Sequence, residues 1–300
     1  MTIAFGDRLA AEFAAGRHLC AGIDPHAGLL AEWELADDAA GAERMGRDVV
    51  AASAGVAACV KPQIAFFERF GSAGLAALER VLADARDAGL IVVADVKRGD
   101  IGTSFAAYAE AWLAPGSPLE SDAMTVVAYQ GFDSLAGAFD LVRAQGKGLF
   151  VLAATSNPEA REVQQAVRDD GRTVAAAMVA DAQRFNDESL ADGSVGSGSV
   201  GSGSVGSGSV GSVGVVLGAT LRLAEYGIET GGLAVSGTAL PVLAPGFGAQ
   251  GARIEDARAI FGGLGAALLA NESRGILSGG PAGLAGRVRA RAEAVAAALA

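Results

Sequence analysis

The chain has 300 residues, of which 51% are hydrophobic and only 6% are aromatic. This supply of apolar residues is enough for the core of one large α/β domain. The formal net charge is −11 and no basic cluster stands out, so we expect no nucleic acid partner.

Cysteine usage and the first residues of the chain indicate a reducing compartment. The two cysteines, Cys20 and Cys59, lie in apolar runs and are expected to be buried free thiols. Residues 1–16 contain several charged side chains and lack the long apolar core of a signal peptide. No apolar run is long enough to span a membrane. We therefore expect a cytoplasmic protein that does not associate with membranes.

Short apolar segments alternate with helical patterns along the whole chain. The strands that we predict cover residues 18–24, 58–67, a segment beginning at 90, 123–129, 148–155, 213–220, 240–248 and 266–271. The helices that we predict cover 5–16, 39–56, 72–88, 103–114, 133–145, 158–190, 254–262 and 281–300, with a short one after 220. Strands that alternate with helices run parallel, and eight such units predict an α/β fold of the (β/α)8 barrel type.

A doubly wound open sheet is the alternative fold. Such sheets usually have a glycine-rich phosphate-binding turn after the first strand. Here the corresponding turn has the sequence Asp24-Pro25-His26, which favours the barrel.

Residues 193–212 repeat the sequence Ser-Val-Gly-Ser-Gly with a period of five. Glycine and serine bury too little surface to offset the entropy that ordering would cost. We therefore predict one domain over residues 1–300 that carries a flexible insertion at about 193–212. Because the repeat precedes a strand, we expect it at the N-terminal end of the barrel, away from any site.

One predicted strand runs directly into a charged cluster. The apolar segment 90–94 is followed by Asp95, Lys97 and Asp100. Strand alternation places Asp95 and Lys97 on the same face, at the end of the strand where barrels build their sites. Two neighbouring carboxylates need a cation between them, which Lys97 can supply. A surface ion-pair network is the alternative interpretation of this spacing.

Lys61 interrupts the apolar strand 58–67. A lysine inside such a strand needs a buried partner, and Asp95 on the neighbouring strand is the obvious one. We therefore predict an array in which Lys61, Asp95, Lys97 and Asp100 alternate in charge.

Two segments near the C-terminus can bind an anion together. Residues 245–252 form a glycine-rich loop whose backbone N–H groups can approach an anion closely. Residues 271–274 follow the last strand and supply the guanidinium of Arg274. Loops after the seventh and eighth strands are the usual phosphate position in a (β/α)8 barrel, so we predict a phosphate site here.

Other reactive residues are expected to be structural or peripheral. His18 precedes a strand, and His26 lies near the predicted barrel mouth. No cluster has the spacing of metal ligands, so we predict no metal. Ser156 lacks the flanking glycines of a nucleophile elbow.

With these motifs in place, the chain resembles the orotidine 5′-phosphate decarboxylase family. The segment Asp95-Val96-Lys97-Arg98-Gly99-Asp100-Ile101 is similar to its D-x-K-x-x-D-I signature. The S-N-P and P-G-x-G-A-Q-G motifs resemble a longer, actinobacterial branch of the family. The resemblance covers the chain apart from the repeat, through Gly22–Pro25, Lys61–Gln63, Thr155–Pro158, Gly218–Thr220, Pro245–Gly251 and Ser273-Arg274.

The resemblance implies a cofactor-independent enzyme that converts orotidine 5′-monophosphate to UMP, the last step of de novo pyrimidine synthesis. It also implies that Lys97 donates a proton to C6, that Asp95 lies against the substrate carboxylate, and that Lys61 pairs with Asp95. The chemistry agrees, because loss of CO2 leaves a carbanion in the ring plane, which a fixed ammonium can stabilise and protonate.

The same resemblance implies which residues bind the other parts of the substrate. Asp24 would bind a ribose hydroxyl, and Ser156 would bond the pyrimidine. Gln250 and Arg274 would hold the phosphate.

The resemblance further implies a homodimer. Asp100 would enter the site of the partner subunit and bond the ribose there, with Ile101 packing beside it. The family usually has Asn-Thr or Ser-Thr after D-I-G, whereas this chain has Thr103-Ser104, which keeps the hydroxyl at Ser104.

Two other functions stay open at the level of sequence. A magnesium-dependent sugar-phosphate decarboxylase or lyase can share the D-x-K-x-x-D pattern on the same barrel. A non-catalytic phosphate-binding barrel is the other alternative, although Lys97 argues against it.

Overall fold

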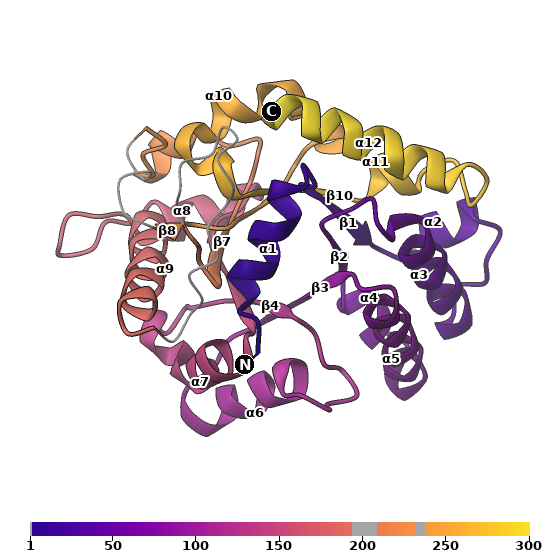
Figure 1. The fold of residues 1–300 in the computed structure, drawn as a ribbon, viewed down its shortest axis with the longest axis horizontal. Helices are drawn as coiled ribbons and strands as arrows, with labels where there is room; N and C mark the ends of the chain where they lie inside the picture. The colour runs from indigo at the N-terminus through magenta and orange to yellow at the C-terminus, as the bar shows by residue number, and fades with distance from the viewer. Residues whose placement is uncertain (1, 194–208, 232–237) are drawn as a thin grey trace.

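The computed structural model describes residues 2–193, 209–231 and 238–300. Eight parallel strands close into a barrel in the order β1-β10-β9-β7-β5-β4-β3-β2, with helices around it (Figure 1). This closed order confirms the predicted (β/α)8 barrel. The barrel strands are β1 (Leu19–Ile23), β2 (Cys59–Pro62), β3 (Ile91–Arg98), β4 (Ala123–Val126), β5 (Gly148–Ala154), β7 (Val213–Leu217), β9 (Val242–Pro245) and β10 (Leu268–Glu272).

Helices follow most of the strands and cover the outside of the barrel (Figure 1). The α-helices are α1 (Phe5–Ala14), α2 (Ala27–Glu32), α3 (Ala39–Ser53), α4 (Ala65–Glu68), α5 (Gly71–Asp87), α6 (Gly102–Leu113), α7 (Ala136–Gln145), α8 (Arg161–Gln164), α9 (Val174–Ala191), α10 (Ala257–Phe261), α11 (Arg274–Leu277) and α12 (Leu284–Leu299). Short 3₁₀ helices cover Phe132–Leu135, Pro158–Ala160, Leu223–Tyr226, Gly248–Gln250, Ile254–Asp256 and Gly262–Ala267. No helix in the described ranges is both long and apolar enough to cross a membrane.

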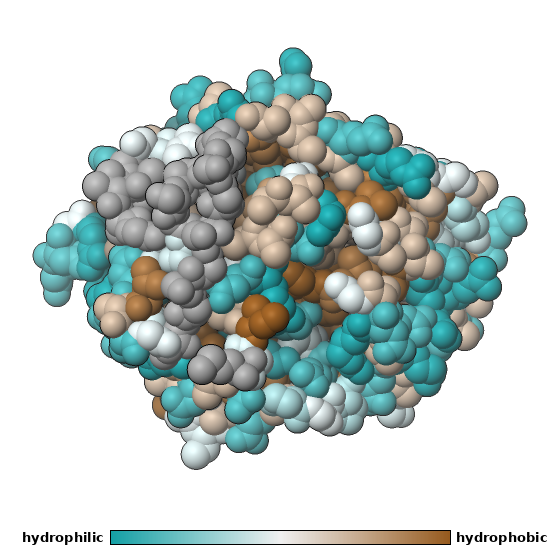
Figure 2. Space-filling view, viewed as in Figure 1, coloured by the Kyte–Doolittle hydropathy of each residue, from teal (hydrophilic) through white to brown (hydrophobic). Residues whose placement is uncertain are grey.

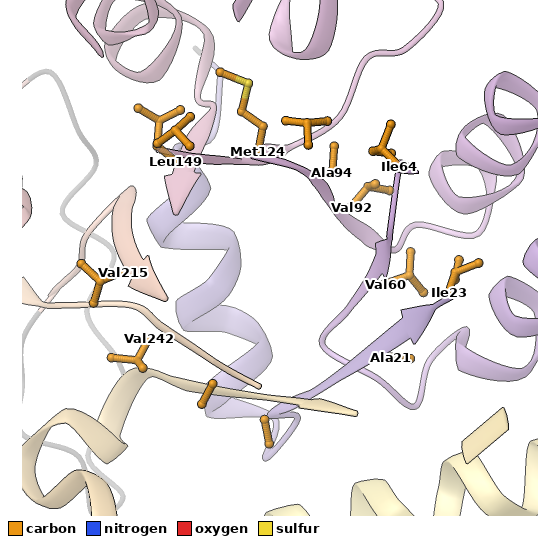
Figure 3. Packing of buried hydrophobic residues seen from close by; sticks show 14 of the residues in the cluster. Ala21, Ile23, Val60, Ile64, Val92, Ala94, Met124, Leu149, Val215 and Val242 are labelled. Carbon is orange, nitrogen blue, oxygen red and sulfur yellow. The ribbon is translucent and has the colours of Figure 1, made fainter. Parts of the chain in front are cut away.

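The alternation of strand side chains separates two cores. Outward positions such as Ile23, Val60 and Val92 are apolar and point from the strands toward the helices (Figure 3). Inward positions form a second cluster at the N-terminal end of the barrel, where Phe5 of α1 packs edge-on against Phe150 with ring centroids 6.0 Å apart. Full burial of a phenylalanine stabilises a fold by about 1.5–3 kcal/mol. Helix α1 therefore closes the end of the barrel opposite the strands' C-terminal ends.

The face that carries α1 is turned to the viewer in Figures 1 and 2. Hydrophilic residues form much of its border, while apolar residues show in the hollows beside α1 (Figure 2). The polar residues predicted to act chemically follow the C-terminal ends of the strands, on the other side of the barrel.

Two predicted elements are wrong in part. The strand predicted over 58–67 ends at Pro62, because buried Ile64 and Phe67 are spaced for a helical turn and lead into α4. The single helix predicted over 158–190 is broken between α8 and α9. Gly171, with φ of +80°, turns the chain there, and the Thr173 hydroxyl caps α9 by accepting from the N–H of Ala176.

The end of the predicted flexible insertion is ordered, which corrects its boundary. Residues Ser209–Val210 form strand β6, which pairs in parallel with β8 (Thr238–Ala239). Val210 is buried, and the Ser212 hydroxyl accepts a hydrogen bond from the N–H of Gly6 at 3.1 Å. Gly6 has no room for a side chain, since a Cβ there would lie 2.0 Å from the Val210 carbonyl oxygen. The rest of the repeat, 194–208, lies outside the described residues, and the single-domain boundary stays a prediction.

Candidate active site

The site is built around the carboxylate of Asp95 on β3, which accepts four hydrogen bonds. Lys61 Nζ and Gln63 Nε2 donate to its Oδ2 at 2.7 and 2.9 Å. Lys97 Nζ and Thr125 Oγ1 donate to its Oδ1 at 2.5 and 2.9 Å. Each carboxylate oxygen therefore receives one ammonium and one neutral donor. The predicted pairing of Lys61 with Asp95 is present.

Electrostatics keep Asp95 and Lys61 ionised despite their burial. Burial alone would raise the pKa of Asp95, but the charges of Lys61 and Lys97 outweigh it and hold that pKa well below its usual range. Burial alone would lower the pKa of Lys61, but the charges of Asp95 and Asp24 hold it well above its usual value. The barrel interior thus contains a carboxylate and an ammonium that both stay charged at neutral pH.

Lys97 has an unusual backbone conformation. Its φ is +47°, in the left-handed region that non-glycine residues rarely adopt. Such a conformation costs of order 1–3 kcal/mol and persists only where the surroundings impose it. It coincides with an irregularity in the β3–β4 ladder, whose register shifts between Ala94 and Arg98. The Lys97 side chain is nevertheless 45% exposed, so its ammonium borders open space.

A cavity of about 250 Å³ opens above this centre. Lys61, Asp95 and Lys97 lie on its charged side, and Leu152, Val216 and Leu243 give it an apolar lining. Polar residues after β5, which include the predicted Ser156, complete the rim. A planar ring that is partly apolar and has polar groups at its edge would fit a cavity with these walls.

A smaller pocket of about 70 Å³ adjoins the cavity where the loop after β9 meets the start of α11. Gln250 and Arg274, which the sequence predicts to hold a phosphate, line it, and Gln250 borders both spaces. Asp24 is also shared, and its Oδ1 is buried without a hydrogen-bond partner among the described residues. The Ser273 hydroxyl in the same pocket is also buried and has no partner in the part of the chain that is described. Among the described residues, the structure thus leaves two buried oxygens beside this pocket without a protein partner.

Backbone and buried charge shape the smaller pocket. Gly246, with φ of +122°, lets the loop after β9 turn close to Ala219. Below the pocket, Glu272 at the end of β10 is buried, and its Oε1 accepts from Arg291 Nε at 3.1 Å and from Arg291 Nη2. Its Oε2 lies so close to Gly275 that a Cβ there would come within 2.8 Å. Glu272 thus connects the start of α11, which lines the smaller pocket, to helix α12.

The structure does not bring every predicted residue into the cluster. Asp100 lies just after β3, where its Oδ1 accepts from the N–H of Ile101 at 2.8 Å. Within the described ranges, Asp100 has no hydrogen bond or ion pair to Asp95 or Lys97. The predicted four-residue array is therefore reduced, within one chain, to Lys61, Asp95 and Lys97. The Asp100 carboxylate bonds instead to the backbone of the residue that follows it. Ile101 is 61% exposed, and Ser104 is exposed in the first turn of α6.

The two histidines have structural contacts, as predicted. His18 donates from Nδ1 to the carbonyl oxygen of Leu268 at 2.9 Å and stacks on Phe13, and its burial lowers its pKa. His26 caps α2 by accepting from the N–H of Leu29 at 3.3 Å. Among the residues with described positions, no group of three His, Cys, Asp or Glu side chains could hold a metal ion.

Sequence reasoning missed Thr125 and the Glu272–Arg291 pair, and it gave Gln63 no role. Thr125 has the same signal as Lys61, a polar residue at an inward position of an apolar strand. Gln63 lies within a motif that carried the family resemblance, but only its contact with Asp95 reveals what it does. The partner of Glu272 is on another element and has no local signal in the sequence.

The fold and this site define a (β/α)8-barrel enzyme with a Lys–Asp–Lys centre beside an anion pocket. Residues 17–285 match the model of the Orotidine 5′-phosphate decarboxylase / HUMPS family, and the chain belongs to that family.

Individual relatives agree with this assignment. The chain is 49% identical to the orotidine 5′-phosphate decarboxylase of Streptomyces coelicolor over 280 residues, which cover 92% of this chain and 91% of the relative. It is also 49% identical to the enzyme of the same name from a Nocardioides species, with 92% of each chain covered. A crystal structure from Streptomyces avermitilis, assigned to orotidine 5′-phosphate decarboxylase, superposes with a TM-score of 0.85 at 47% identity, covering 100% of this chain and 97% of that one. The Leishmania donovani OMP decarboxylase gives a TM-score of 0.69 at 28% identity, with coverage of 98% and 99%.

Proposed function

We propose that this protein decarboxylates orotidine 5′-monophosphate to UMP, the last step of de novo pyrimidine synthesis. Curated relatives with this name, 49% identical over nine-tenths of the chain, support the assignment. The observation that carries it is the ammonium of Lys97, bonded to Asp95 at the edge of a cavity that adjoins an anion pocket. A nucleotide can place its base in the cavity and its phosphate in the pocket.

Lys97 acts on the reacting carbon in this proposal. The bond between C6 and the carboxyl carbon breaks, CO2 leaves, and the electron pair stays on C6. The ammonium stabilises this charge as it forms and then transfers a proton to C6. Lys97 becomes neutral in that step and regains a proton from water, which its exposed side chain can reach.

Asp95 has two roles in the same step. Its carboxylate faces the carboxylate of the substrate and repels it, and this repulsion disappears when neutral CO2 departs. Its four donors also fix its orientation, so it holds Lys97 in place. Lys61 supplies the buried counter-charge, which keeps Asp95 ionised.

The remaining contacts orient the nucleotide. The unpartnered Oδ1 of Asp24 suits a ribose hydroxyl, and Ser156 on the cavity rim suits the pyrimidine. Gln250 and Arg274 suit the phosphate. Contacts this far from C6 can raise the rate as well as the affinity, because they fix the reacting groups relative to each other.

The proposal includes a homodimer located in the cytoplasm. Asp100, Ile101 and Ser104 lie near the mouth of the barrel without entering the cluster of their own chain. The exposure of Ile101 and Ser104 beside the half-buried Asp100 supports a role in the site of a partner subunit, where Asp100 would bond the ribose.

The test is ultraviolet detection of orotidine 5′-monophosphate loss, with EDTA present, for wild type and Lys97→Ala. We expect fast turnover by wild type and its collapse in the variant. Turnover that EDTA abolishes would instead favour metal-dependent chemistry. Binding of UMP without turnover would favour a non-catalytic barrel, and turnover that survives the substitution would overturn the role of Lys97.

A further inference from the structure

Thr125 occupies the point where the strained backbone and the charged centre meet. The residue is 1% exposed. Its hydroxyl oxygen accepts a hydrogen bond from the backbone N–H of Lys97 at 2.9 Å and donates one to Asp95 Oδ1 at 2.9 Å. That same Asp95 oxygen accepts from the Lys97 ammonium at 2.5 Å. One hydroxyl therefore closes a ring that starts and ends on Lys97.

The Thr125 hydroxyl takes the place of a backbone acceptor where the β3–β4 ladder is irregular. Residue pairing between β3 and β4 goes from Ala94 opposite Met124 directly to Arg98 opposite Val126. Three residues of β3, 95–97, thus lie opposite Thr125 alone. The Lys97 N–H in this irregular segment takes the Thr125 hydroxyl as its acceptor. A valine of the same shape could fill the space but could not accept that bond.

We propose that Thr125 is a positioning residue for proton delivery: its hydroxyl holds Lys97 in the left-handed conformation that directs the ammonium to Asp95 and the cavity. Without the hydroxyl, the Lys97 N–H loses its partner and the strained conformation loses one of its supports. Lys97 then moves toward an ordinary strand conformation, in which its ammonium no longer has a fixed place beside Asp95. The kinetic part of this inference rests on the proposed function.

The kinetic test compares Thr125→Val with Thr125→Ser. The valine variant removes the hydroxyl and keeps the volume, while the serine variant keeps the hydroxyl. Misplacing a reacting group slightly can cost about a hundredfold in rate, so we expect kcat of Thr125→Val to fall about tenfold to a hundredfold. The KM should stay within about threefold, because the cavity and the anion pocket are unchanged. Thr125→Ser should recover most of the rate.

A matched control is Thr238→Val, since Thr238 is also buried and its hydroxyl has no partner among the described residues. We expect its kcat to equal that of wild type. If Thr125→Val is poorly folded, Thr125→Ala and Thr125→Ser form a second comparison, in which the two variants differ only by the hydroxyl. A kcat for Thr125→Val within twofold of wild type, or equal losses in the serine and alanine variants, would overturn the inference.

A crystal structure of Thr125→Val separates this inference from the proposed function. We expect Lys97 to leave the left-handed region in the variant. Lys97 with unchanged φ would overturn the positioning role even if the enzyme turns over its substrate. If wild type fails to consume orotidine 5′-monophosphate, the proposed function fails. The φ angle of Lys97 in the variant structure still tests whether Thr125 holds its backbone.

Discussion

Lys61 Nζ lies 2.7 Å from Asp95 Oδ2, and both side chains are buried inside the barrel. Removing one member of a buried ion pair leaves an uncompensated charge, which costs about 3–5 kcal/mol. We therefore expect Asp95→Asn to lower the free energy of unfolding by about 3 kcal/mol or more, because two ammonium groups lose their carboxylate. Urea unfolding checks this value. Asp48→Asn removes a surface pair with Arg44 and should change stability by about 0.5 kcal/mol at most.

The same variant has a defined pH dependence. The pKa of Asp95 is depressed in the folded state, so its contribution to stability is full above its unfolded value of about 3.9 and is lost as pH falls further. The pKa of Lys61 is raised, so its contribution is full below about 10.4 and is lost only at higher pH. In wild type, the contribution of this pair to the free energy of unfolding should therefore be constant from about pH 5 to pH 9. In Asp95→Asn, Lys61 stays buried but loses this counter-charge, so its pKa should fall and the stability deficit of the variant should shrink as pH rises. A deficit that grows with rising pH in this range would contradict this account.

The barrel and its charged pair could be predicted from the sequence because both leave local signals. Unbroken apolar runs indicate strands buried on both faces, and Lys61 and Asp95 are conspicuous as charges within two of them. Their pairing then follows from the neighbouring positions of β2 and β3 in the barrel.

Other features depend on backbone geometry that no periodic pattern encodes. The left-handed φ of Lys97 and the register shift in β3 create the need for the Thr125 hydroxyl, and neither is visible in an apolar strand. Asp100 was predicted beside Lys97 because the two are close in sequence, but its carboxylate bonds to the N–H of Ile101. The partner of Glu272 is fixed by the packing of α12, which is a tertiary contact.

Arg274 should affect ligands only through their phosphate. A hydrogen bond to a charged group contributes about 1.5–3 kcal/mol, so Arg274→Ala should raise the KM for orotidine 5′-monophosphate roughly tenfold to a hundredfold. The affinity for uridine, which lacks the phosphate, should stay unchanged. Steady-state kinetics checks the KM, and isothermal titration with UMP and uridine compares the affinities with and without the phosphate. Arg253→Ala is the control, because Arg253 follows the same loop but is exposed and does not line the pocket. Equal losses for UMP and uridine would place Arg274 elsewhere in the site.

Glu272 should support the start of α11, which lines the smaller pocket. The Glu272→Gln substitution keeps the size of the side chain but removes the charge that Arg291 binds. We expect a loss of about 1–3 kcal/mol in unfolding free energy and weaker binding of UMP, because Ser273 and Arg274 follow directly in the chain. Urea unfolding and UMP titration measure the two effects. Arg289→Ala, an exposed change on the same helix α12, should leave both unchanged. Normal UMP affinity in Glu272→Gln would show that the smaller pocket does not need this pair.

Deletion of residues 194–208 should leave activity within a few-fold of wild type. The ordered residues that follow, Ser209–Val210, pack near α1 at the end of the barrel opposite the site. A deletion that keeps β6 and its pairing with β8 therefore removes nothing that lines the cavity among the described residues. Steady-state kinetics and thermal unfolding of the shortened protein measure the effect. A large loss of activity with unchanged stability would mean that the repeat acts at the site or between subunits.

A shared site between subunits predicts that two inactive variants complement each other. Lys97→Ala lacks the ammonium that we propose delivers the proton, and Asp100→Ala lacks the carboxylate that we propose enters the partner subunit's site. In a mixed dimer, one site loses both groups and the other keeps both. Random mixing makes half of the dimers mixed, so activity should rise to about a quarter of wild type. The two proteins are unfolded together, refolded and assayed, with each variant refolded alone as the control. If the mixture stays as inactive as the separate variants, Asp100 acts within its own chain or the sites are not shared.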